Sequence, residues 1–139
     1  MPQVSAILVN YHSQQETCRC LEHLYSQSIR PDYLCIVDNG SSENSRNIFE
    51  SFKESHPDIS FLFFFNEKNP GFAAACNQAM KALTEQGFRG YFWLVNNDTV
   101  ADKNALKELL GEAERTHAGI TGSRISLPDD RRSGSARIH

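Results

Sequence analysis

The sequence lacks any uncharged apolar stretch that reaches the roughly 18 residues a membrane-spanning helix needs. Its first residues, Met1, Pro2 and Gln3, also lack the basic region that leads into the apolar part of a secretory signal. We therefore expect the chain to act in the cytoplasm, either free or at the inner face of the membrane.

An excess of basic charge is also missing. The 14 lysines and arginines are outnumbered by 17 acidic residues, which gives a net charge of -3 and a pI near 5.9. Proteins that bind a nucleic acid duplex usually present a basic face. The composition argues against a nucleic acid partner and leaves a small anionic ligand open.

Cysteines are few, and they do not form paired Cys-x-x-Cys motifs of the kind that hold zinc. The four are Cys18, Cys20, Cys35 and Cys76, of which the last two lie among apolar residues. We expect free, buried thiols that act as small hydrophobic side chains in a reducing compartment.

Four short apolar runs, rich in β-branched and aromatic residues, predict buried strands. They cover residues 4–9, 33–37, 59–65 and 91–95. Their nearly continuous apolarity favours strands covered on both faces, as in a parallel sheet. Apolar residues spaced three and four apart between the runs predict helices, most clearly over residues 72–83.

This alternation of strand and helix predicts an α/β fold with a mostly parallel, layered sheet and right-handed crossovers. The length of 139 residues fits one domain, which we place at residues 1–125. A weaker fifth strand is expected at residues 119–123. Residues 126–139 read as an irregular tail.

Polar residues follow every predicted strand. They are Asn10-Tyr11-His12, Asp38-Asn39-Gly40, Asn66-Glu67-Lys68-Asn69 and Asn96-Asn97-Asp98. In open α/β sheets, ligands bind in the crevice beyond the carboxyl ends of the strands, so these residues predict a binding site. Turn and helix-cap chemistry is an alternative explanation for part of the pattern.

Two acids, Asp38 and Asp98, follow apolar runs, Asp38 at once and Asp98 after two asparagines, and we expect both to need partners. Asp98 is suited to hold Mg²⁺ or Mn²⁺ jointly with a diphosphate, because these ions often take only one or two protein carboxylates. The alternative is a cap for the helix that starts near Asp102, and Asp102 is better placed for that role. Asp38 is suited to accept the imino N–H of uracil or thymine, or else a hydrogen bond within its own turn.

The segment from Asn69 to Asn77 predicts the start of the third helix. Pro70 sets the turn, and Gly71 allows backbone to approach a ligand. The N-terminus of the helix offers N–H groups to phosphate or sugar oxygens. The alanines that follow also suit close packing of helix on sheet, which does not exclude a ligand.

Taken together, five segments resemble family-2 inverting glycosyltransferases of the GT-A fold. They are VSAILVNYHS, CLEHLYSQS, CIVDNGSSENS, NPGFAAACNQA and YFWLVNNDTVAD, which span residues 4 to about 125 in the family's order. Within the family, the N-N-D-T and N-x-G-F forms are similar to bacterial rhamnosyltransferase-like members that build surface polysaccharides.

The resemblance implies a set of donor-site residues. They are Val9, Asn10 and Tyr11 at the start of the nucleotide pocket, Asp38 at the base, Asn69 and Gly71 toward ribose or phosphate, Asn97 beside the ribose or sugar, and Asp98 at the metal. The family's D-x-D-type motif binds Mg²⁺ or Mn²⁺ on the donor diphosphate. Here it reads Asn96-Asn97-Asp98, so one acid remains.

By the same resemblance, the chain takes part in transfer of a sugar from a UDP- or dTDP-sugar to a saccharide or lipid-linked acceptor, with inversion. The family's catalytic base lies downstream, in an acceptor-binding part of which residues 126–139 would be the start. We therefore identify no catalytic residue and expect this chain alone to bind donor without transferring sugar.

Other readings of the sequence are open to test. One is a non-catalytic module that binds nucleotide-sugars or has a regulatory role. A receiver domain is disfavoured because its acidic pair is absent after the first strand, and a dinucleotide-binding oxidoreductase because G-x-G-x-x-G is absent there. An open sheet edge near residues 119–139 would also favour a homo-oligomer.

Overall fold

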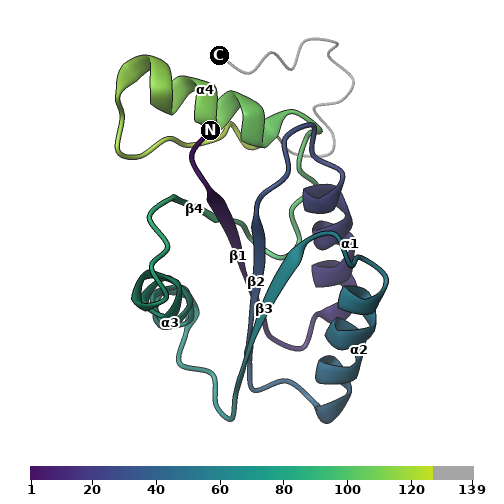
Figure 1. Cartoon of the computed structure of the whole chain (residues 1–139). Coiled ribbons are helices and arrows are strands. Elements are labelled where there is room, and N and C mark those ends of the chain that lie inside the picture. Colours follow the sequence, from purple (N-terminus) through teal and green to yellow (C-terminus); the bar gives the residue numbers. More distant parts are fainter. Residues whose placement is uncertain (127–139) are drawn as a thin grey trace.

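The computed structural model describes residues 1–126, which form a four-stranded parallel sheet flanked by helices (Figure 1). The strand order across the sheet is β3-β2-β1-β4. The elements are β1 (Val4–Asn10), α1 (Gln14–Tyr25), β2 (Tyr33–Asn39), α2 (Glu43–Glu54), β3 (Ser60–Asn66), α3 (Phe72–Glu85), β4 (Tyr91–Leu94) and α4 (Ala105–Thr116). The predicted alternation of strand and helix is confirmed.

The helices cover the sheet in two layers. Side chains of α1 and α2 pack on one face against Ala6, Leu8, Leu34 and Ile36, and α3 packs on the other against Ile7, Cys35 and Val37. Alternate strand residues point to opposite faces, so these two groups have opposite parity along each strand. Burying a Leu or Ile side chain contributes roughly 1.5–3 kcal/mol, which makes these two layers the main source of stability.

The register of the strands brings their polar ends together. Asn10 on β1 lies beside Asp38 on β2, which lies beside Phe65 on β3. One residue further along, Asn39 lies beside Asn66. Because alternate residues of a strand point to opposite faces, the side chains of Asn10, Asp38 and Phe65 face α1 and α2. Those of Asn39 and Asn66 face α3. The two rows therefore belong to different clusters at one edge of the sheet.

The expectation that all four strands are buried on both faces is correct only for the central pair. Strands β1 and β2 are almost wholly buried, but β3 and β4 are half-buried and Leu94 is 47% exposed. The reason is topological, because β3 and β4 form the two edges of the sheet in the described residues.

The expected fifth strand is wrong. Residues 119–123 are irregular, and Ile120 is 93% exposed. Gly119 and Gly122 flank Ile120 and Thr121, and glycine loses the most conformational freedom when a strand forms, so two β-branched residues between glycines do not hold a strand. The sheet edge that we expected near residues 119–139 is therefore absent from residues 119–126, and residues 127–139 of the predicted tail lie outside the described residues. The edge strands within the described residues are β3 and β4.

Helix α4 begins later than predicted. Its N-cap is Asn104, and Asp102 instead forms the turn before it, accepting the backbone N–H of Asn104 at 2.8 Å on its carboxylate. The backbone carbonyl of Asp102 accepts the N–H of Ala105 at 3.0 Å.

Among residues 1–126, none of the helices is long and apolar enough to span a lipid bilayer.

Candidate functional site

The carboxyl edge of the sheet is organised by Asn10, whose side chain is fully buried. Its amide nitrogen Nδ2 donates to Asp38 Oδ1 and to Ser41 Oγ, both at 3.1 Å. Its Oδ1 accepts the hydroxyl of Thr17 at 2.7 Å. One side chain thus joins β1 to α1, to β2 and to the loop after β2, and we call this set the Asn10 network.

Asp38 is 3% exposed, and both of its carboxylate oxygens accept hydrogen bonds within the protein. Oδ1 accepts from Asn10, and Oδ2 accepts the hydroxyl of Ser45 in the first turn of α2. Two neutral side chains, those of Asn10 and Ser45, therefore satisfy this buried carboxyl group. Each oxygen keeps a second lone pair, but a nucleobase reaches this buried carboxyl group only if neighbouring residues move.

Asn97 joins the same network from the loop after β4. Its Nδ2 donates to Ser13 Oγ at 2.6 Å and to Thr17 Oγ1 at 3.0 Å. Three of the predicted residues, Asn10, Asp38 and Asn97, are therefore connected through shared hydrogen bonds, with Thr17 between the first and the last.

Asp98 is exposed on a turn closed by the N–H of Thr99, which donates to the carbonyl of Asn96 at 3.0 Å. Within residues 1–126, its carboxylate takes part in no hydrogen bond or ion pair, and no three or more His, Cys, Asp or Glu side chains group to hold a metal. A single free carboxylate fits Mg²⁺ or Mn²⁺ that is otherwise held by phosphate oxygens and water. It does not fit a cage built by protein alone.

Cys20 lies next to the turn that carries Asp98, and its Sγ donates to the carbonyl of Asn96 at 3.6 Å. Burial raises the pKa of the Cys20 thiol to about 12, the Thr99 backbone opposes this, and the Asp98 carboxylate adds to the rise. Burial therefore dominates the pKa of this thiol, and the Thr99 backbone and the Asp98 carboxylate act on it in opposite directions.

A second cluster lies on the α3 side of the sheet and is built from side-chain amides. Asn69 Oδ1 accepts from Asn39 Nδ2 at 3.1 Å and from the backbone N–H of Gly71 at 2.9 Å. Asn66 donates to Asn39 at 3.1 Å and to Gln78 at 2.9 Å, and Gln78 donates back at 3.0 Å. This ladder fixes the start of α3 against β2 and β3.

Gly71 caps α3 with a positive φ of 92°, and a side chain placed there would meet no atom within 4 Å. The position therefore needs glycine for its backbone conformation and leaves open space in front of the helix. Sequence reasoning placed Asn39 and Asn66 among the polar residues at the strand ends without giving either a role, and it did not select Gln78. The signal available was the recurrence of amide side chains at strand ends and on the facing turn of the helix.

The remaining predicted residues lie apart from these clusters. Val9 is half-buried and packs in the core beneath α3. Tyr11 is 52% exposed and its ring lies 4.3 Å from that of His12, whose backbone N–H donates to Ser41 Oγ at 2.9 Å. Tyr11 is therefore free to contact a ligand, whereas Val9 contributes through packing or its backbone.

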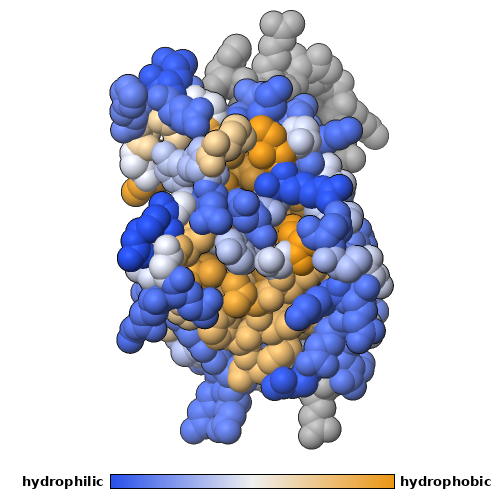
Figure 2. All heavy atoms as spheres, viewed as in Figure 1, coloured by the Kyte–Doolittle hydropathy of each residue, from blue (hydrophilic) through white to orange (hydrophobic). Residues whose placement is uncertain are grey.

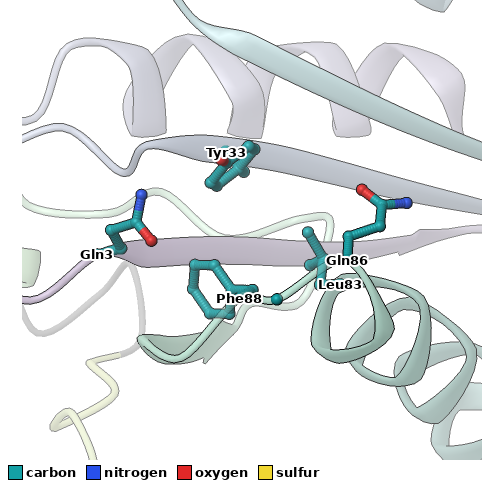
Figure 3. A pocket seen from close by; sticks show the side chains of 6 residues that line it. Gln3, Tyr33, Leu83, Gln86 and Phe88 are labelled. Atoms are coloured by element: carbon teal, nitrogen blue, oxygen red, sulfur yellow. The ribbon is translucent and has the colours of Figure 1, made fainter.

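Two hollows lie elsewhere. The cavity in Figure 3, of about 160 Å³, is lined by Gln3, Tyr33, Leu83, Gln86, Gly87 and Phe88 at the amino ends of the strands. A groove of about 460 Å³ runs beside β4 and α4. Neither includes a predicted site residue, and the first is smaller than the roughly 300–1,000 Å³ of ordinary ligand pockets.

Comparison with known proteins identifies the domain. The family model described as glycosyl transferase family 2 matches residues 5–139. The chain belongs to glycosyl transferase family 2. Chondroitin synthase of Escherichia coli is 28% identical to this family-2 chain over 112 residues, which are 81% of the chain and 15% of the synthase.

Solved glycosyltransferases share its fold. A mannosyltransferase from Pyrobaculum calidifontis, in complex with GDP-Man and Mn²⁺, gives a TM-score of 0.74 at 19% identity, over 93% of this chain and 37% of that one. S. aureus TarS 1-349, in complex with UDP, gives 0.66 at 21% identity, over 90% and 38%. The predicted GT-A fold is confirmed. The family-2 chain spans well under half the length of these proteins.

Proposed function

We propose that this chain binds a uridine or thymidine diphospho-sugar at the carboxyl edge of its sheet and is the donor half of an inverting glycosyltransferase. The observation that carries the proposal is the convergence of the Asn10 network with the free carboxylate of Asp98 at one edge of a family-2 domain. The network holds Asn97, and with it the turn that carries Asp98, in one arrangement before a ligand arrives, whereas the loop at Ser41 would have to open to admit the base.

Asp98 would hold Mg²⁺ or Mn²⁺ against the donor diphosphate. The bound metal would neutralise charge on the departing diphosphate. The support is the exposed, unpartnered carboxylate among the described residues and the Mn²⁺ present with GDP-Man in the similar mannosyltransferase. Asn97, held by Ser13 and Thr17, would fix the turn on which Asp98 lies. Its Oδ1, which accepts no hydrogen bond within the described residues, would contact the ribose or sugar.

The nucleoside would lie over the ends of β1 and β2. Asp38 would accept the imino N–H of uracil or thymine, after the loop at Ser41 opens. Asn69 and Gly71 would approach the ribose or phosphates from the α3 side, where the space before Gly71 is open. Val9 and Tyr11 would form the wall of the pocket at the end of β1.

The rest of the reaction is proposed for a longer protein. The chain covers 15% of chondroitin synthase and 37% of the mannosyltransferase. We place the acceptor wall and the general base that takes the acceptor's proton in a part that follows residue 125, of which residues 126–139 would be the start. The acceptor would be a saccharide or a lipid-linked saccharide, and the subfamily rhamnosyltransferase-like, with a role in surface polysaccharide synthesis.

Membership of family 2 favours this proposal over a non-catalytic binding module. Calorimetric titration of the chain in Mn²⁺ with UDP, dTDP, CDP and GDP tests it. We expect UDP and dTDP to bind more tightly than CDP, because cytosine lacks the imino N–H that Asp38 accepts. Equal affinity for all four would contradict the proposed contact between Asp38 and the base. No binding of any of them would contradict the proposed donor site.

A further inference from the structure

Strand β3 forms a long, open and strongly apolar edge of the sheet. Within residues 1–126 it pairs with β2 alone, from Ser60 to Asn66. The five residues between these ends are Phe61, Leu62, Phe63, Phe64 and Phe65, and the last four are half-buried. Figure 2 shows a broad pale-orange band in its lower half, where Figure 1 draws β3 between α2 and α3.

The usual protections of an edge strand are missing from β3. Natural edges carry charges, proline or a bulge, because a row of unpaired backbone groups templates pairing with another chain. Between Ser60 and Asn66 there is no charged residue and no proline, and the pairing with β2 proceeds residue by residue without a bulge. The other edge, β4, is four residues long, against seven for β3.

We propose that β3 pairs antiparallel with β3 of a second copy of this chain, about a two-fold axis that passes midway between the two Phe63 residues. Two four-stranded sheets would then form one continuous eight-stranded sheet. In this register Phe61 lies opposite Phe65 of the second copy, Leu62 opposite Phe64, and Ser60 opposite Asn66. Every apolar residue of the strand therefore meets an apolar residue.

Side-chain direction selects this register over its neighbours. A two-fold axis normal to the sheet keeps each face on its own side, so opposed residues must have the same parity. A shift of two residues in one direction sets Phe61 opposite Glu67, and a shift in the other sets Phe64 opposite Ser60. Only the register centred on Phe63 matches all five apolar residues.

The aromatic side chains of β3 are already arranged as a row that pairing would extend. Ring centroids lie 5.9 Å apart for Phe61 and Phe63 and 5.9 Å apart for Phe63 and Phe65, and Phe63 stacks on Phe49 of α2 at 6.4 Å. In the dimer this row would continue into that of the second copy on the same face. Cross-strand aromatic pairs are among the contacts that stabilise sheets most.

Charge at the ends of the strand favours the antiparallel arrangement. Asp58 lies two residues before Ser60 and Lys68 lies two residues after Asn66, so the proposed register sets them opposite each other. Asp58 is paired with Arg30 at 2.6 Å, whereas Lys68 is exposed and takes part in no ion pair within the described residues. A parallel, in-register pairing would instead place Asp58 beside Asp58 and Lys68 beside Lys68.

The mass of the chain at increasing concentration, by light scattering or sedimentation, tests the proposal. We expect a dimer for the unmodified chain. Phe63→Lys brings two lysines together on the axis and should give a monomer with an unchanged circular dichroism spectrum. Leu94→Lys is the matched control on the other edge and should remain a dimer. A monomer at all concentrations would overturn the proposal, as would a dimer lost only in Leu94→Lys.

Because Phe63 also packs on Phe49, a cross-linking experiment avoids relying on that variant alone. In a Cys18→Ser background, Phe63→Cys should form a disulfide-linked dimer, since opposed Cα atoms in antiparallel strands lie about 4.5–5.5 Å apart. Phe61→Cys and Phe65→Cys should cross-link when mixed, and far less when each is alone. Equal cross-linking alone and mixed, or none at all, would overturn this register.

Discussion

Replacing Thr17 with valine tests whether the Asn10 network holds the site together. Thr17 is fully buried in α1, and valine keeps its shape while removing the hydroxyl. That hydroxyl donates to Asn10 Oδ1 at 2.7 Å, has the Ser13 carbonyl as a second acceptor at 3.0 Å, and accepts from Asn97 Nδ2 at 3.0 Å. Asn97 keeps its bond to Ser13, but Asn10 Oδ1 loses its hydrogen-bond donor within the described residues.

A buried acceptor without a donor costs about 1–3 kcal/mol, so we expect Thr17→Val to lower the free energy of unfolding by about 2 kcal/mol. With an unfolding entropy of about 2.1 cal/mol/K per residue, that is a fall in Tm of about 7 °C for this chain. Urea and thermal denaturation measure both. Thr17→Ser keeps the hydroxyl and loses a methyl group worth about 0.8 kcal/mol. A valine variant as stable as the serine variant would refute the reasoning.

Two further predictions concern stability and thiol chemistry. Gly40 has a φ of 84°, and an added Cβ would lie 3.0 Å from the carbonyl oxygen of Glu67, so Gly40→Ala should cost at least about 1 kcal/mol in urea denaturation. The control is Gly111, which is exposed in a helix and has no atom within 4 Å of an added Cβ. Gly111→Ala should raise the free energy of unfolding by about 0.5–1 kcal/mol. Equal effects at both positions would contradict the argument. Burial raises the pKa of Cys20 and of Cys35 to about 12 from 9.0, so at pH 8 a thiol reagent should modify half-buried Cys18 first and these two only after unfolding. These thiols ionise at a lower pH in the unfolded chain than in the folded one, so the stability that they contribute should be fully present below pH 9.0 and should fall as the pH rises toward 12. A free energy of unfolding that rises over this range would contradict the raised pKa values.

Much of the fold follows from local pattern. The four apolar runs became strands within one or two residues of their predicted ends, and the stripe from Phe72 to Leu83 became α3. Periodicity also predicted that polar residues gather at one edge. The predicted fifth strand is absent because its two β-branched residues, Ile120 and Thr121, lie between glycines and do not pair with β4.

The hydrogen-bond partners within the site could not be predicted from the sequence. Whether Asp38 faces a ligand or the protein depends on where Asn10 and Ser45 lie in three dimensions, and both are distant from it or on another element. The same holds for Asn39 and Asn66, which meet only because β2 and β3 pair in one register. Residue type marked the edge of the sheet, whereas register decided which side chains bond to one another.

The most direct test of the central claim is the affinity for UDP, measured with Mn²⁺ and with EDTA, for the unmodified chain and for Asp98→Asn. The exposed turn makes the substitution harmless to folding, which circular dichroism would verify. We predict that Mn²⁺ raises the affinity of the unmodified chain at least about tenfold, or about 1.4 kcal/mol, and leaves that of the variant nearly unchanged. An equal response to Mn²⁺ in both proteins would contradict the account.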